Sequence, residues 1–184
     1  RDATFTNLKD HHELYCFGHL IEGAVAYFQA TGKDKLLKAA ERFADYVAAN
    51  FGTEEGKLHG YPGHEIAEMA LVRLYELTGK EKYLNLARYF VDERGKRPYY
   101  FDQEHPEEVK KGHEDELRYF YNQAHLPVRE QDEAFGHSVR AVYLYSGMAD
   151  VARLTGDETL YGACRRLWDN ITEKKMYVTG GIGS

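Results

Sequence analysis

The sequence has 184 residues and a formal net charge of −6 at neutral pH, from 30 acidic and 24 basic side chains. This length suffices for one domain with a hydrophobic core of its own. A surface that binds nucleic acid needs clustered Lys and Arg to release counterions from phosphates, so the acidic balance argues against this class of partner and favours a neutral or polar one. No apolar run approaches the roughly 20 residues that cross a bilayer, and we expect no membrane partner.

The first predicted element is a helical hairpin over residues 10–51. Apolar side chains recur every third or fourth residue on both sides of a Thr-Gly pair at 31–32, which indicates two amphipathic helices joined by a tight turn. Asp10 can cap the first helix, with Glu13 reaching back as in a capping box. Asp34 can cap the second.

The same hairpin recurs twice along the chain. The second copy covers about residues 62–95 and the third about 132–172, and each has a Thr-Gly turn between its helices. When the copies are aligned on these turns, Asp45, Asp92 and Asp169 fall at the same position. The repeat predicts an all-α fold of αα-hairpins, which can stack as an open superhelix or curl into a closed ring of inner and outer helices.

Residues 96–127 interrupt the repeat between the second and third hairpins. They combine an aromatic stretch at 99–101 with a charged run at 107–116. A run of charges is usually a solvated surface, so we expect a surface connection here. It is long enough to contain a short helix and to fold over one end of the structure.

Histidines occupy matching places near the start of the first helix of each hairpin. His19, His64 and His137 each follow a glycine, and His12 lies one or two turns ahead of His19. In a closed ring these helix starts converge on one mouth, where imidazoles could bind sugar hydroxyls or transfer protons. A single histidine at a helix start is more often structural, but three at equivalent places strengthen the functional interpretation.

The cysteines allow a different hypothesis. His12, Cys16 and His19 would share one helix face and could be read as three zinc ligands. No Cys-x-x-Cys motif accompanies them and a closed site needs a fourth ligand, so a packing role for Cys16 is favoured. Cys16 and Cys164 are expected to be free thiols, which is typical of a reducing compartment and predicts a cytoplasmic location.

Carboxylates near the histidines are candidates for hydrolytic chemistry. Cleavage of a glycosidic bond generally needs one acid that protonates the leaving oxygen and one nucleophile or base. Four carboxylates lie beside the histidines in the sequence: Glu13, Glu65, Glu130 and Glu133. Helix capping explains the first two equally well. Arg129 and Arg140 could neutralise these carboxylates or contact a substrate.

Several motifs, taken together and in order, resemble a known family. They are residues 12–16, 18–22, 60–65, 128–131, 136–141 and 175–184. They make the chain similar, over essentially its whole length, to the glycoside hydrolase family 127 β-L-arabinofuranosidases. The resemblance implies an (α/α)6 barrel, of which this chain would form about half, and release of β-L-arabinofuranose from arabinosides or arabinan-type glycans with retention of configuration.

The resemblance also implies which groups act. In that family a zinc-bound cysteine serves as nucleophile, a glutamate serves as general acid/base, and histidines at the starts of inner helices bind the sugar. By matching positions, the sugar-binding residues are His12, His64 and His137, and the further candidates are His19, Glu65 and Glu133.

The motifs that carry the resemblance include neither the nucleophilic cysteine nor the acid/base glutamate of the family. Neither Cys16 nor Cys164 matches the zinc-cysteine cluster, and the sequence stops before the acid/base segment. We therefore expect no catalytic residue and no metal in this chain, no activity from it alone, and an open apolar face covered by the rest of the barrel or by another copy.

Two other functions compete with a hydrolase. An epimerase of the same barrel type would also line its pocket with histidines, which would act as acid and base on a ring-opened sugar. A helical-repeat binding module would form an open superhelix with a long concave face. The motifs favour the hydrolase.

Overall fold

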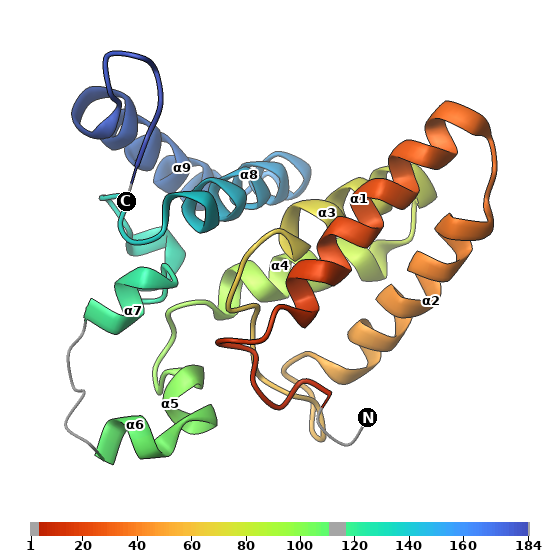
Figure 1. The fold of residues 1–184 in the computed structure, drawn as a ribbon, viewed down its shortest axis with the longest axis horizontal. Coiled ribbons are helices and arrows are strands. Elements are labelled where there is room, and N and C mark those ends of the chain that lie inside the picture. The colour runs from red at the N-terminus through yellow and green to blue at the C-terminus, as the bar shows by residue number, and fades with distance from the viewer. Residues whose placement is uncertain (1–3, 111–116, 184) are drawn as a thin grey trace.

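The computed structural model describes residues 4–110 and 117–183, and the regular elements within these ranges are helices (Figure 1). Three helix pairs follow the three expected hairpins: α1 (Glu13–Thr31) with α2 (Lys35–Asn50), α3 (Ala67–Thr78) with α4 (Glu81–Glu93), and α8 (Ser138–Thr155) with α9 (Glu158–Asn170). A π-helical segment, η2 (Ile171–Lys175), continues α9. The predicted all-α hairpin fold is confirmed.

The same turn ends the first helix of each pair. Gly32, Gly79 and Gly156 adopt left-handed φ values of 70°, 68° and 66°, which cost glycine little because it has no Cβ. The N–H of Gly32 donates to the carbonyl of Phe28 at 2.8 Å, and the other two turns repeat this bond. The recurring Thr-Gly pairs are therefore the helix stops that the sequence indicated.

The start of α1 differs from the prediction. His12, not Asp10, occupies the N-cap position, and it makes no side-chain cap. Glu13 accepts a hydrogen bond from the backbone N–H of Phe5 at 2.9 Å. The predicted capping box is wrong because the preceding segment folds back over the helix start and takes this carboxylate.

The other two predicted starts also depend on context. Asp34 does occupy the N-cap position of α2, but its side chain makes no cap bond and pairs with Lys38 instead. Asp157 caps α9 by accepting from the N–H of Leu160 at 2.9 Å.

The first helices of the three hairpins pack side by side. Helix α1 contacts α3, and α3 contacts α8. These crossings are close, because a Cβ on Gly18 would lie 2.6 Å from Cγ2 of Ile66, and one on Gly147 would lie 2.8 Å from Cβ of Glu68. Of the second helices, α2 contacts α4, whereas α4 contacts α8, the first helix of the third hairpin.

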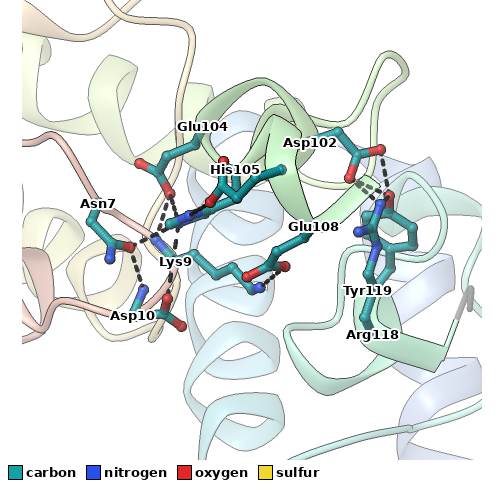
Figure 2. A network of polar contacts seen from close by, with 10 residues as sticks. Asn7, Lys9, Asp10, Asp102, Glu104, His105, Glu108, Arg118 and Tyr119 are labelled. Atoms are coloured by element: carbon teal, nitrogen blue, oxygen red, sulfur yellow. Dashed lines mark hydrogen bonds and ion pairs between the residues drawn. The ribbon is translucent and has the colours of Figure 1, made fainter. Parts of the chain in front are cut away.

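The insertion contains three short helices, α5 (Tyr100–Glu104), α6 (Pro106–Lys110) and α7 (Leu117–Tyr121), followed by the 3-10 turn η1 (Val128–Glu130). Figure 2 shows how it is tied to the N-terminal segment. Glu104 accepts from the backbone N–H of Lys9 at 2.9 Å, and the Lys9 ammonium pairs with Glu108. The expectation of a purely solvated charge run is therefore wrong for Glu108. Residues 111–116 of that run lie outside the described residues.

Two further findings concern the chain as a whole. Both cysteines are free, with Cys16 exposed and Cys164 partly buried. Across residues 4–110 and 117–183, we find no helix that is both long and apolar enough to cross a membrane.

Candidate functional site

Histidines from all three hairpins meet at one place. The ring centroids of His12 and His64 are 5.6 Å apart, and those of His64 and His137 are 5.9 Å apart. His12 and His137 are the N-cap residues of α1 and α8, while His64 lies in the loop before α3. The expected convergence of the inner-helix starts is confirmed, but the expected match of His19 with His64 and His137 is wrong, because His19 lies within α1 and His12 stands at its start. Sugar binding by these three side chains stays a prediction.

Two tyrosines complete this group. The ring of Tyr15 lies 4.3 Å from that of His64 and 4.4 Å from that of His19. Tyr143 of α8 lies 6.0 Å from His19 and 6.3 Å from His64. We call the six residues the histidine–tyrosine cluster: His12, Tyr15, His19, His64, His137 and Tyr143.

Sequence reasoning missed both tyrosines because aromatic residues on helices usually fill cores. A signal existed for Tyr15, which lies three residues after His12 and four before His19 and therefore shares their helix face.

The backbone before His64 is fixed by three separate segments. The N–H of Gly63 donates to the carbonyl of Leu8 at 3.0 Å. The carbonyl of Gly63 accepts from Asn122 Nδ2 at 2.8 Å and from Arg140 Nη1 at 3.0 Å. A Cβ on Gly63 would lie 2.2 Å from the Leu8 oxygen, so glycine is required at this junction. The position of His64 therefore depends on the N-terminal segment, the insertion and α8 together.

His137 is placed by the segment that joins α7 to α8. Gly136 has a φ of 75°, and a Cβ there would lie 2.1 Å from the carbonyl oxygen of Phe120. Gln123 Nε2 donates to the carbonyl of Phe135 at 2.8 Å and holds this turn. The Nδ1 atom of His137 is buried and has no hydrogen-bond partner among the described residues. A ligand hydroxyl could satisfy it.

The hydrogen bonds of two histidines define their tautomers. His64 Nδ1 lies 3.0 Å from the carbonyl of Glu65, and His12 Nδ1 lies 3.1 Å from the carbonyl of Asp10. A carbonyl can only accept, so each Nδ1 carries the proton and, in the neutral ring, each Nε2 is left as an acceptor. Burial lowers the pKa of His64 to about 4, with Arg140 among the charges that act in the same direction. His64 is therefore neutral at physiological pH and suited to accept from a hydroxyl.

A buried ion cluster supports the loop that carries His64. Glu65, Glu68 and Arg94 are all fully buried. Arg94 Nη1 lies 2.9 Å from Glu65 Oε1, and Arg94 Nη2 lies 3.3 Å from Glu68 Oε1. Burial raises the pKa of Glu65 to about 8, and the neighbouring Glu68 adds to the shift. With no exposed surface, Glu65 would influence a bound sugar through His64 and not by direct contact.

The remaining charged candidates are engaged elsewhere. Glu133 pairs with Lys175 at 2.9 Å, and Glu130 is exposed on η1. Arg129 pairs with Asp92 and Asp157, both at 2.7 Å, so the interpretation that it neutralises the neighbouring glutamates is wrong.

Arg140 does remain close to the cluster. Besides its bond to the Gly63 carbonyl, its guanidinium lies 4.6 Å from the centre of the Tyr121 ring.

The zinc implied by the family resemblance does not fit the residues present. Within the part of the chain that the structure describes, no group of three or more His, Cys, Asp or Glu side chains is arranged to hold a metal ion. His12, Cys16 and His19 are no exception, and no chemical step is assigned to zinc on this chain.

Comparisons with known proteins agree on one family. Residues 1–184 match the family described as beta-L-arabinofuranosidase, GH127 catalytic domain. The chain is 45% identical over 187 aligned residues to a non-reducing end beta-L-arabinofuranosidase of Bifidobacterium longum subsp. longum, covering 98% of this chain and 28% of the relative.

Solved structures give the same result. The fold superposes with a TM-score of 0.91 on Ara127N-Se, a GH127 beta-L-arabinofuranosidase from Geobacillus stearothermophilus T6, at 52% identity, covering 99% of this chain and 29% of that one. The GH127 beta-arabinofuranosidase BT3674 matches with a TM-score of 0.85 and 48% identity, covering 98% and 26%. The chain thus spans less than a third of the length of these relatives.

Proposed function

Since this chain belongs to the GH127 β-L-arabinofuranosidase catalytic-domain family, we propose that it supplies the sugar-binding part of an enzyme that releases L-arabinofuranose from β-linked arabinosides. The observation that carries the proposal is the convergence of His12, His64 and His137 from three hairpins. The names of the relatives support the reaction and the sugar.

The cluster can bind a sugar through complementary hydrogen bonds. The Nε2 atoms of His12 and His64 accept from ring hydroxyls, because their Nδ1 protons are used by backbone carbonyls. The buried Nδ1 of His137, which has no partner among residues 4–110 and 117–183, offers a further hydrogen bond. The rings of Tyr15 and Tyr143 can pack against the apolar face of the sugar.

The lowered pKa of His64 favours binding over proton transfer. An epimerase needs an acid and a base whose pKa values lie near the working pH. A group with a pKa of about 4 is unprotonated at neutral pH and is a weak base. This property argues against the epimerase, and the hydrolase relatives support the hydrolase over both the epimerase and a non-enzymatic binding module.

The rest of the catalytic machinery is proposed to lie in sequence beyond these 184 residues. This includes the nucleophile, the acid/base glutamate and the zinc that the resemblance implies. Support comes from the lack of a three-ligand group in the described residues and from relatives more than three times as long. The barrel remainder would also cover the open side of α8 and α9. The free thiols of Cys16 and Cys164 support a cytoplasmic location.

The test is kinetic and uses the complete enzyme that contains this chain. His64→Ala and His137→Ala should each lower kcat/KM on a β-L-arabinofuranoside roughly 5- to 150-fold, equivalent to about 1–3 kcal/mol per lost buried hydrogen bond. His59→Ala is the matched control, because His59 is exposed and outside the cluster. Unchanged kinetics in both cluster variants would remove these residues from the site, and absence of arabinose release by the unmutated enzyme would refute the function.

A further inference from the structure

A short stretch of the N-terminal segment orients two of the three candidate sugar-binding histidines through its backbone carbonyls. The carbonyl of Leu8 accepts from the N–H of Gly63 at 3.0 Å, immediately before His64. The carbonyl of Asp10 accepts from His12 Nδ1 at 3.1 Å and so leaves Nε2 of this ring as an acceptor. The orientation of both histidines therefore depends on where this backbone lies.

One buried carboxylate holds the same backbone. Glu104, the last residue of α5, accepts from the N–H of Leu8 at 2.5 Å through Oε1 and from the N–H of Lys9 at 2.9 Å through Oε2 (Figure 2). The Glu104 side chain is only 3% exposed, so these bonds are shielded from competing water. Hydrogen bonds to an ionised acceptor are also about twice as strong as those between neutral groups. The insertion thus fixes two consecutive peptides of the N-terminal segment.

The fixed backbone packs closely against the loop that carries His64. A Cβ on Gly63 would lie 2.2 Å from the Leu8 oxygen and 2.3 Å from the Lys9 oxygen. Leu8 is 2% exposed, and its Cδ1 would lie 2.6 Å from a Cβ on Gly60. Closely packed interiors transmit small displacements, so a shift of the Leu8–Lys9 peptide would move Gly63 and with it His64.

The neighbouring His105 reinforces this hold. Its Nε2 lies 3.1 Å from Asn7 Oδ1, which also accepts from the N–H of Asp10 at 3.0 Å (Figure 2). An amide oxygen can only accept, so Nε2 of His105 carries a proton and donates. The same Nε2 lies 3.4 Å from the Glu104 carboxylate. The insertion therefore also contacts the residues that place the Asp10 carbonyl beside His12.

We propose that Glu104 is a positioning residue for His12 and His64. Its carboxylate holds the Leu8–Lys9 backbone, so that the two rings meet in the histidine–tyrosine cluster with their Nε2 atoms placed to accept from a sugar. Both carboxylate oxygens are used by backbone N–H groups, so Glu104 acts through the histidines and not by contact with the sugar. This inference rests on the proposed function, because it assumes that the cluster binds a sugar.

The test measures kcat and KM separately on a β-L-arabinofuranoside, in the complete enzyme that contains this chain. Glu104→Gln keeps the size of the side chain but leaves a single oxygen to accept. It should raise KM roughly 5-fold and change kcat less than about 2-fold, because misplaced histidines lose contacts that ground state and transition state share. Glu104→Ala loses both bonds and should raise KM further.

Glu108→Gln is the matched control. Glu108 joins the same two segments, but it pairs with the Lys9 ammonium and not with the backbone. This variant should leave KM unchanged. Hydrogen exchange of residues 59–66, followed by mass spectrometry, reports on the Gly63 N–H without any substrate. Exchange there should be faster in Glu104→Gln than in the unmutated enzyme or in Glu108→Gln.

Three results would overturn the inference. One is a lower kcat at unchanged KM in Glu104→Gln, because a smaller folded fraction would then explain the loss. Another is an equal rise of KM in Glu108→Gln. The third is unchanged exchange of residues 59–66. A complete enzyme that releases no arabinose but shows the faster exchange would refute the proposed function and support the hold of Glu104 on the loop of His64.

Discussion

Arg94→Met should be among the most destabilising single substitutions in this chain. Arg94 is fully buried and lies within 3.3 Å of two buried carboxylates, those of Glu65 and Glu68. It also donates to the carbonyls of Asn122 at 2.8 Å and Pro62 at 2.6 Å. Removing one partner of a buried ion pair costs about 3–5 kcal/mol, because the remaining charge stays buried and uncompensated.

The measurement is urea unfolding followed by circular dichroism at pH 7. Arg73→Met is the matched control: Arg73 links α3 to Glu22 of α1, but its side chain is 46% exposed, so its pair should contribute only about 0–1 kcal/mol. Adding Glu68→Gln to Arg94→Met should recover part of the loss by removing the buried carboxylate that Arg94 no longer pairs with. A loss for Arg94→Met no larger than that for Arg73→Met would refute the reasoning.

Three further predictions concern stability. Burial raises the pKa of Glu65 from its ordinary 4.5 to about 8, so the stability that this group contributes is complete below pH 4.5 and is lost as pH rises toward 8. Glu65→Gln should flatten this pH dependence of the free energy of unfolding in urea titrations, and an unchanged slope would contradict it. Gly18→Ala should lower the free energy of unfolding by about 1–3 kcal/mol, because its methyl group would clash with the loop before α3. Gly23→Ala meets open space and should raise the free energy of unfolding by about 0.5–1 kcal/mol. Equal effects of the two substitutions in thermal unfolding would rule out the close crossing. Asp157→Ala should lower the free energy of unfolding by about 1–2 kcal/mol, because the Asp157 side chain caps α9. Asp34→Ala should cost less, because Asp34 makes no cap bond, and the reverse order in urea unfolding would be incompatible with the observed caps.

The hairpin repeat could be predicted from sequence because its signals are local. Apolar spacing marks the helices, and a glycine at Gly32, Gly79 and Gly156 marks the stops with a left-handed φ. The same alignment does not place His19, His64 and His137 at one repeat position, and the histidines at the helix starts are His12 and His137, with His64 in the loop before α3. Once α1, α3 and α8 pack side by side, these starts must converge.

The helix caps and the insertion could not be predicted because distant segments determine them. Glu13 is taken by the backbone of Phe5 and not by its own helix start. Glu108 of the charged run forms an ion pair with Lys9, which lies near the N-terminus (Figure 2). Sequence spacing contains no record of such contacts.

The site was predicted in part for the same reason. The motifs of the family resemblance pointed to His12, His64 and His137, but the burial of Glu65 depends on Arg94 after the end of α4, which no motif connects to it. Tyr143 reaches the cluster only because α8 packs against α3. From sequence alone, a tyrosine in an apolar helix is interpreted as a residue of the hydrophobic core.

The central claim is that the converging histidines hold the arabinofuranose, and calorimetric titration of L-arabinose into the complete enzyme tests it most directly. We expect His64→Ala and His137→Ala each to raise the Kd by roughly 5-fold or more, from the loss of about 1 kcal/mol or more per hydrogen bond, while the exposed His59→Ala leaves it unchanged. Equal Kd values for the unmutated enzyme and both cluster variants would contradict the claim.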